Sequence, residues 1–408
     1  MTTAAALAPA DTAAHERRIT VALFAAGLTT FASMYSAQAL LPSLSAAFGA
    51  TPARAALAVS LTTGLLAVTI LPMSVLSNRF GRTRMMIGSA MAASAIGLLL
   101  PFSPSLGVLL AGRAVQGVAL AGVPAVAMAY LAEEIGAAGL GAAMGVYVAG
   151  TTVGGLAGRL IPAFTLEVGS WRWGQATVAV AAALCAGIFV RMLPPSRRFS
   201  ARPLDIRTLT ADFAGHLRDR TLLPLFALAF VMMGGFVSIY NFLGYRLTRD
   251  PFGLSAATVG LVFVLYLAGT VTSAAAGRMT DRYGRSRVFG VALAVMGVGV
   301  ALTLPDSLPI ILLGVLLCTA GFFAIHAVAS GWVGSAATGN RAAASALYLF
   351  AYYLGSSIAG GAGGIAYGHY GWTGLSLYVA VLLVLAATLV GVLVTRSRAT
   401  SAAERARD

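Results

Sequence analysis

The fold is decided by Gly277-Arg278-Met279-Thr280-Asp281-Arg282-Tyr283-Gly284-Arg285-Ser286-Arg287, a short basic loop between two long apolar runs. A related loop, Asn78-Arg79-Phe80-Gly81-Arg82-Thr83-Arg84, lies in the first half of the chain. Gly81 and Gly284 are separated by about half of the 408-residue chain. The sequence therefore predicts two tandem copies of one unit, each with a basic loop at the same place.

The composition is that of a protein embedded in lipid. Hydrophobic residues make up 59% of the chain and charged residues 10%, and the mean hydropathy is +0.86. Apolar runs of about 20 residues recur along nearly the whole length, and each is long enough to cross a bilayer as a helix. The runs are continuous and do not alternate as β-barrel strands do. We expect an all-α, multi-pass membrane protein.

Twelve transmembrane helices are predicted, in two groups of six. The first group covers residues 19–44, 55–77, 84–102, 106–131, 140–165 and 172–193. The second group covers residues 221–245, 256–277, 287–304, 309–333, 342–367 and 373–395. The stretch between the groups is too polar for lipid and is typical of a linker. The expected parts are an N-terminal tail (1–18), a first six-helix half (19–193), a linker (194–220), a second six-helix half (221–395) and a C-terminal tail (396–408). The two halves are expected to be pseudo-symmetric.

The arginines predict the orientation in the membrane. The net charge is +14 and all 27 basic residues are arginine. Twenty-one of them lie in loops on one side of the predicted membrane, at 17–18, 79–84, 191–220, 278–287, 341 and 396–407, and four lie on the other, at 54, 172, 246 and 249. Cytoplasmic loops carry the excess of basic residues. We therefore expect both termini and the linker in the cytoplasm, and no binding of nucleic acid.

The residues that metal or acid–base chemistry requires are scattered. Cys185 and Cys318 both fall inside apolar runs and have no disulfide or metal-binding spacing. The four histidines do not cluster with carboxylates. We expect no metal and no cofactor, which argues against an integral-membrane enzyme. A channel fits poorly with a duplicated six-helix architecture and two basic loops.

The loop from Gly277 resembles the G-x-x-x-D-R-x-G-R signature of the major facilitator superfamily, and its place after the second and eighth spans strengthens the resemblance. Arg113-Ala114-Val115-Gln116-Gly117 resembles the R-x-x-Q-G element on the fourth span of proton-linked members. Gly150-Thr151-Thr152-Val153-Gly154-Gly155 is similar to the fifth-span G-P-x-x-G-G element of antiporters, except that Thr151 replaces the proline. Residues 121–130 and 346–357 resemble the bacterial acriflavine-sensitivity branch of drug and sugar efflux permeases.

This resemblance implies a secondary carrier of a bacterial inner (cytoplasmic) membrane that works by alternating access. We expect proton-linked efflux of a small organic compound by a monomer, with a facilitator or an uptake symporter with protons as the alternative. No carboxylate lies deep in any predicted span, whereas a carrier for lipophilic cations generally needs a buried negative charge. The expected substrate is therefore neutral or anionic.

The basic loops are predicted to form the inner gate. Asp281 is placed to face the positive amino end of a helix in the other half, and separating that contact would open the gate. In the first copy Asn78 stands at this position and brings no charge, so its contact is expected to be weaker. The alternative is that the arginines only fix the topology. The predicted gating residues are Asn78, Arg79, Gly81, Arg82, Asp281, Arg282, Gly284 and Arg285.

Four residues are candidates for coupling transport to protons: Arg113, Glu133, Glu134 and His326. A charge such as that of Arg113 inside an apolar run suggests function, but a packing arginine bonded to carbonyl groups is the alternative. The two glutamates either titrate or form ion pairs with Arg79, Arg82 or Arg84. His326 has an unperturbed pKa near 6.5, and its alternative role is a hydrogen bond between helices.

The substrate is expected to meet polar and aromatic side chains of spans one, four, seven, ten and eleven. Spans one, seven and eleven line the central cavity in proteins that this chain resembles. Arg159 lies nearer the outer boundary, where it could snorkel, and is expected to be structural. The predicted substrate-binding residues are Tyr35, Gln38, Arg113, Gln116, Tyr240, Asn241, His326 and Tyr352, with Tyr353 as a further aromatic candidate.

Overall fold

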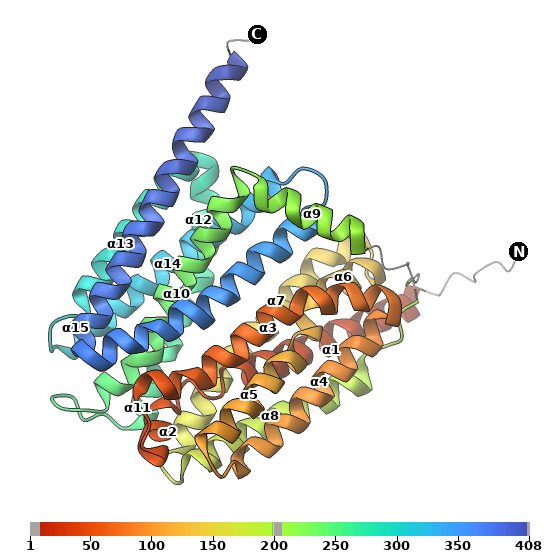
Figure 1. Ribbon diagram of the computed structural model, residues 1–408. Coiled ribbons are helices and arrows are strands. Elements are labelled where there is room, and N and C mark those ends of the chain that lie inside the picture. Colours follow the sequence, from red (N-terminus) through yellow and green to blue (C-terminus); the bar gives the residue numbers. More distant parts are fainter. Residues whose placement is uncertain (1–8, 198, 200–205, 406–408) are drawn as a thin grey trace, which may run out of the picture.

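A computed structural model describes residues 9–197, 199 and 206–405, and these residues form helices joined by short connections (Figure 1). The first group of helices comprises α1 (Pro9–Tyr35), α2 (Leu41–Phe48), α3 (Pro52–Phe80), α4 (Arg82–Leu99), η1 (Leu100–Phe102), α5 (Leu106–Leu120), α6 (Gly122–Glu134), α7 (Ala137–Thr165) and α8 (Trp171–Met192). A single helix, α9 (Ile206–Arg218), follows. The second group comprises α10 (Leu222–Leu247), α11 (Ala256–Leu261), η2 (Val262–Tyr266), α12 (Leu267–Tyr283), α13 (Arg285–Leu302), α14 (Leu308–Ala336) and α15 (Arg341–Arg405).

Eleven helical stretches of the described chain are long and apolar enough to cross a membrane. The last of them, Arg341–Arg396, has 56 residues, about twice the length of a single span. It contains Gly371, whose backbone (φ 61°, ψ −149°) is not helical, and Figure 1 shows α15 as two arms that meet at a bend. Counting α15 as two crossings gives the predicted twelve, so the all-α membrane fold in two six-helix halves is confirmed.

The two halves lie side by side, and the ends of the bundle differ (Figure 1). Helix α9 and both chain ends lie at one end, and α2 and α11 lie at the other. We call these the α9 end and the α2 end. The halves meet where α3 packs along α15 and where α7 packs against α11. A Cβ atom on Gly364 of α15 would lie 2.7 Å from Cα of Ala53 in α3, so only glycine permits this close approach at the α2 end.

The glycines of the two basic loops have a structural reason. Gly81 and Gly284 each separate two consecutive helices, and their φ angles of 97° and 82° lie in a region that other residues rarely adopt. Within the N-terminal half, Gly154 of α7 packs on α1, where an added Cβ would lie 2.5 Å from the carbonyl oxygen of Leu28. Gly154 therefore allows α7 and α1 to approach closely, as small residues do between membrane helices.

Two boundaries differ from the sequence-based expectation. The first span was predicted to continue to residue 44, but α1 ends at Tyr35, and a turn at 36–40 precedes the short helix α2. The linker at 194–220 was expected only to be polar, but its second part forms the helix α9. Its His216 imidazole is 3.0 Å from the backbone oxygen of Asn340, which ties α9 to the start of α15. Linker residues 198 and 200–205 lie outside the described residues.

Candidate functional site

A central cavity of about 160 Å³ lies between the two halves. Helices α1 and α7 contribute one wall, and α10, η2, α12, α14 and α15 contribute the other. Most of the lining is aromatic or apolar, with three threonines and one charged residue. The lining residues are Phe31, Tyr35, Thr151, Thr152, Gly155, Leu156, Arg159, Met233, Phe236, Tyr266, Leu267, Thr270, Phe323 and Tyr352.

Arg159 is the one charged residue among those lining residues, and its side chain is 3% exposed. Its guanidinium carbon lies 3.9 Å from the centre of the Tyr35 ring and 4.5 Å from that of Tyr266, one ring from each half. No ion pair to Arg159 is found in the described part of the chain. Burial of an unpaired charge is unfavourable, and cation–π contacts offset this only in part. The site therefore holds a cation that an anionic group can neutralise.

The expectation that Arg159 would snorkel to the membrane boundary is wrong. Helix α7 turns this side chain inward, between the halves, where it is almost fully buried. The signal that could have found it was present, since a charge inside an apolar run suggests function by default. Arg159 and Arg113 both lie inside apolar runs.

A chain of three polar side chains joins the halves beside the cavity. Nε of Arg159 donates to Oε1 of Gln38 over 2.6 Å, and Nε2 of Gln38 donates to Oδ1 of Asn241 over 2.7 Å. Gln38 stands in the turn after α1, and Asn241 lies in α10. The two amides are 203 positions apart, the same separation as that of Gly81 and Gly284 in the two basic loops. The structure thus brings together two predicted substrate-binding residues as a contact between halves.

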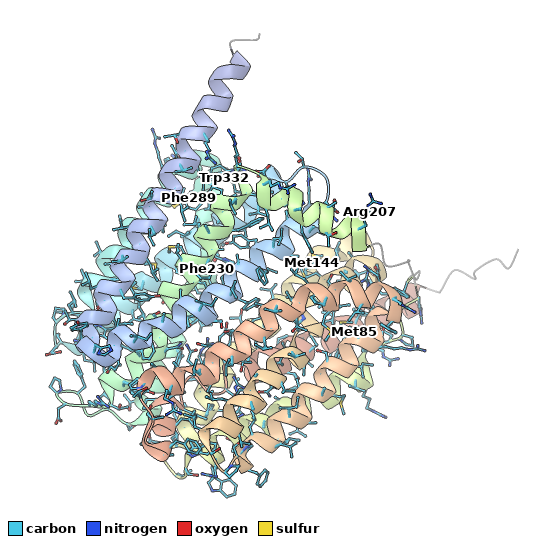
Figure 2. The ribbon with its side chains drawn as sticks, viewed as in Figure 1. Met85, Met144, Arg207, Phe230, Phe289 and Trp332 are labelled. Atoms are coloured by element: carbon cyan, nitrogen blue, oxygen red, sulfur yellow. The ribbon has the colours of Figure 1, made fainter. Side chains whose placement is uncertain are left out.

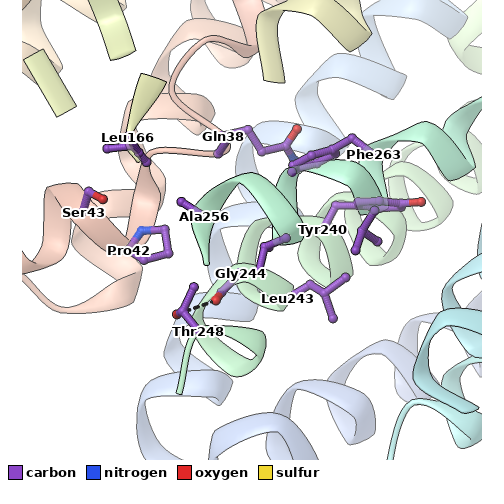
Figure 3. A pocket seen from close by; sticks show the side chains of 14 residues that line it. Gln38, Pro42, Ser43, Leu166, Tyr240, Leu243, Gly244, Thr248, Ala256 and Phe263 are labelled. Carbon is purple, nitrogen blue, oxygen red and sulfur yellow. Dashed lines mark hydrogen bonds between the residues drawn. The ribbon is translucent and has the colours of Figure 1, made fainter. Parts of the chain in front are cut away.

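A second pocket, of about 50 Å³, lies at the α2 end of the same interface (Figure 3). Gln38, Tyr240 and Phe263 line it, and Figure 3 shows Gln38 beside Phe263. Gln38 also binds Arg159, which lines the central cavity. The chain Arg159–Gln38–Asn241 is therefore part of the partition between the two spaces.

The α2 end is closed by further hydrogen bonds between the halves. The hydroxyl of Tyr245 lies 2.7 Å from that of Ser45 and donates to the backbone oxygen of Leu41 over 2.8 Å. The carboxylate of Glu167 accepts from the backbone N–H of Ala257 over 2.8 Å. Every hydrogen bond that joins the halves in the described residues lies at the α2 end or at the Gln38–Asn241 contact. The described chain is therefore closed at the α2 end and has no such bond at the α9 end.

Arg113 lies inside the N-terminal half and away from the central cavity. Its side chain is fully buried, and it donates to the backbone oxygens of Ala58, Ser33 and Met34 over 2.9, 2.8 and 2.6 Å. The last carbonyl groups of a helix have no partner within that helix, and α1 ends at Tyr35, so Arg113 satisfies two of them. This geometry favours the alternative of a packing arginine.

The other residues of this cluster also bind within the half. Gln116 accepts from Nη1 of Arg113 over 2.7 Å and donates to the backbone oxygen of Ala93 over 3.1 Å. Ser36 accepts from the same nitrogen over 3.1 Å. Neither Arg113 nor Gln116 is among the residues that line the two pockets described above, and their contact with substrate stays a prediction.

The remaining predicted binding residues lie around the C-terminal side of the cavity. Nδ1 of His326 is 2.9 Å from the hydroxyl of Tyr348, and its ring centre is 4.7 Å from that of Tyr352, which lines the cavity. The hydroxyl of Tyr240 lies 2.7 Å from that of Thr319. Tyr353 is buried in an apolar cluster that includes Tyr35. His326 is thus one aromatic ring away from the cavity and makes the predicted bond between helices.

The basic loops are each bound within their own half. In the first, Arg82 pairs with Glu133 at 2.8 Å and also bonds Ser77, which confirms the ion pair that was one of the alternatives for Glu133. Glu134 accepts from the hydroxyl of Ser196 and the backbone N–H of Arg197 over 2.6 and 2.7 Å.

In the second loop, Arg285 donates to the hydroxyl of Ser335 over 2.9 Å and lies over the ring of Trp332, which packs on Phe289 (Figure 2). Arg79 and Arg282 lie over the neighbouring rings of Phe80 and Tyr283.

Asn78 and Asp281 make no side-chain hydrogen bond or ion pair in the part of the chain that the structure describes, and Asp281 is exposed. The predicted contact between these positions and the opposite half is not formed here, and the gate stays a prediction. The described residues also contain no group of three or more histidines, cysteines or carboxylates that could hold a metal ion.

Comparisons with known proteins agree with this architecture. The family model of the Major Facilitator Superfamily matches residues 23–249 and 225–408. The inner membrane transport protein YnfM of Escherichia coli (strain K12) is 44% identical over 92% of this chain and 89% of its own length. The uncharacterized MFS-type transporter YybF of Bacillus subtilis (strain 168) is 41% identical over 92% of this chain and 93% of its own.

Among solved structures, a variant of the nucleoside transporter NupG superposes with a TM-score of 0.76 at 13% sequence identity, over 92% of this chain and 99% of that one. At this identity the likeness supports the fold alone. The family match covers both halves, and two relatives exceed 40% identity over nearly the full length. The chain is therefore a membrane transporter that belongs to the Major Facilitator Superfamily.

Proposed function

We propose that this transporter exports a small neutral or anionic organic compound in exchange for protons, across a bacterial inner membrane and with both termini in the cytoplasm. The observation that carries the substrate class is the charge of the central cavity. Arg159 is the one charged residue that lines it, and no carboxylate stands among the lining residues. A cationic substrate would meet an uncompensated positive charge there, at low dielectric, where like charges repel most strongly.

Alternating access is supported by the unequal ends of the interface. The hydrogen bonds between the halves gather toward the α2 end, while the α9 end carries the two basic loops. We assign the α9 end to the cytoplasm because the arginine-rich loops lie there. The described conformation then corresponds to an inward-facing state. In the opposite state the bonds of Gln38, Tyr245 and Glu167 would separate, and contacts between the basic loops and the other half would form.

The proposal of proton exchange rests on His326 and on the glutamates at the end of α6. His326 contacts Tyr352 of the cavity wall, so a change in its charge would act at the substrate site. Glu133 is bound to a basic loop through Arg82, and its protonation would release that loop. The R-x-x-Q-G element that begins at Arg113 resembles proton-linked members, although here it binds within its own half. Membership of the drug and sugar efflux branch is part of this proposal.

The test uses inverted membrane vesicles that contain the protein and a pH-sensitive dye. After respiration has acidified the interior, a transported compound should raise the internal pH, because export moves it inward in these vesicles as protons leave. Counterflow of a labelled compound with no pH signal would show a facilitator. A compound that drives protons in the same direction as itself would show a symporter. Vesicles with the Arg159→Gln variant provide the control for leakage.

A further inference from the structure

We propose that Arg159 recognises a carboxylate group on an aromatic substrate. This carboxylate displaces Gln38 and thereby breaks the partition between the central cavity and the second pocket, which lies at the α2 end and is called the outer pocket below. The inference rests on the proposed function in one respect, that the central cavity receives the substrate. It goes further in naming the chemical group that is read and in assigning recognition and gating to the same side chain.

The hydrogen bonds of Arg159 leave part of its guanidinium available. Nε is bound to Gln38 and Nη1 to the backbone oxygen of Gly155, both over 2.6 Å, whereas Nη2 has no hydrogen bond in the described part of the chain. Nε and Nη2 form one edge of the planar guanidinium, and this edge matches the two oxygens of a carboxylate. One donor of that edge is free and the other is held by a neutral amide.

The surroundings of Arg159 favour a flat, ring-bearing ligand. Tyr35 and Tyr266 lie against the guanidinium, and Phe263 is 5.3 Å from it. Phe31, Phe236 and other rings complete the cavity wall. Aromatic pairs contribute beyond the burial of apolar area. A benzoate-like compound would therefore place its carboxylate on Arg159 and its ring among these side chains.

The amide oxygen of Gln38 and the substrate carboxylate would compete for Nε of Arg159, and the bond to Gln38 is the weaker of the two. A carboxylate can accept from Nε and Nη2 together, whereas the amide oxygen of Gln38 accepts only from Nε. The carboxylate would also compensate the buried charge of Arg159, which the neutral amide does not. Once displaced, Gln38 keeps only its bond to Asn241. Because Gln38 joins the halves through Asn241 and also lines the pocket at the α2 end, its movement would loosen the α2 end and open that pocket to the outside.

Recognition is tested by calorimetric binding to the purified protein, with benzoate as the probe and benzamide as its neutral analogue. We expect benzoate to bind at least tenfold more tightly than benzamide. Arg159→Gln should remove this preference. Arg159→Lys should reduce it, because lysine keeps the positive charge but lacks the two parallel N–H donors of the guanidinium edge. The matched control is Arg54→Gln, which removes an exposed arginine at the same end of the molecule and should keep the preference.

Thermal unfolding of each variant serves as the test of folding. If benzoate and benzamide bind equally, if neither binds, or if folded Arg159→Gln keeps the preference, the proposed recognition is wrong. Binding is measured without a membrane or a gradient, so its result is independent of the direction of transport. Benzoate binding without any pH signal in vesicles would reject proton exchange but leave the recognition site intact.

Release of the partition is tested by cysteine labelling. Ser43 lines the outer pocket, so Ser43→Cys is introduced into a protein with Cys185→Ser and Cys318→Ala and labelled with an impermeant maleimide in right-side-out vesicles. We expect benzoate to accelerate labelling severalfold and Gln38→Ala to give fast labelling without benzoate. With Arg159→Gln, benzoate should have no effect. Labelling that benzoate leaves unchanged in the otherwise unaltered protein would overturn the displacement of Gln38.

Discussion

The two halves repeat one fold, yet they divide its chemistry unequally. Both have a basic loop with a glycine of positive φ, and both contribute an amide to the Gln38–Asn241 contact. The N-terminal half also buries two arginines, Arg113 and Arg159. In the C-terminal half, the candidate for a charge deep in a span is His326. Duplication therefore accounts for the scaffold and for the contact between halves. In the proposed function, the charge that selects a substrate belongs to one half alone.

The largest effect is expected from Arg113, which holds the N-terminal half together and has no counterpart in the other. Arg113→Ala leaves the carbonyl groups of Ala58, Ser33 and Met34 without their donor. We expect the free energy of unfolding in detergent to fall by about 3 kcal/mol. If the variant is as stable as the unaltered protein but does not transport, Arg113 acts in the transport cycle and the structural interpretation is wrong.

Arg159 should behave in the opposite way, with a large effect on transport and a small one on stability. Arg159→Gln removes the cavity charge, and loss of a charged hydrogen bond to substrate should reduce transport roughly 10- to 100-fold. Vesicle uptake and membrane abundance are measured together. Normal transport by this variant would mean that the charge difference between the halves has no role in substrate choice.

The Gln38–Asn241 contact offers a test of the symmetry itself. Gln38→Ala and Asn241→Ala each remove the bond between the halves, so each should accelerate labelling at Ser43→Cys by about fivefold, as expected for one neutral hydrogen bond. Gln38→Ala also releases Arg159 and should have the larger effect. Equal or slower labelling in both variants would show that this contact does not hold the α2 end closed.

The basic loops differ in their partners, and Glu133 sharpens that difference. Glu133→Gln breaks the ion pair with Arg82. The Glu133 side chain is 29% exposed and that of Arg82 13%, so the free energy of unfolding should fall by only about 0.5 kcal/mol, and by less at high salt. Ser335→Ala, which removes the acceptor of Arg285, should lack this salt dependence.

The double Gln variant at Glu133 and Glu134 tests proton coupling, and proton-driven flux that survives it would exclude both glutamates as proton sites.

The smallest effect is expected at the position that distinguishes the two loop signatures. Asp281→Asn removes a charge that is exposed in this conformation, and it should favour the inward-facing state about twofold by weakening the helix-dipole contact of the opposite state. Asn78→Asp should shift the equilibrium the other way. Labelling of a cytoplasmic cysteine measures both, and identical rates in the two variants would remove the proposed latch.

The sequence was sufficient for the repeat because hydropathy and arginine placement repeat directly along the chain. It also pointed to Gln38 and Asn241, as polar residues on spans that line the central cavity in the proteins that this chain resembles. Arg159 was misjudged although its place inside an apolar run is a signal of function, because the rotation of α7 that turns its side chain toward the other half is set by long-range packing. The end of α1 at Tyr35 was missed for a similar reason, since Arg113, distant in sequence, supplies the partners of its last carbonyl groups.

The meeting of Gln38 and Asn241 has an evolutionary consequence. Two amides that occupy equivalent places in a repeat and touch each other resemble the self-complementary contact of a symmetric dimer. In an ancestral pair of identical halves, one substitution would have changed both sides of this contact at once. In a fused chain each side can vary alone, and here the two sides differ by one methylene, glutamine in one half and asparagine in the other.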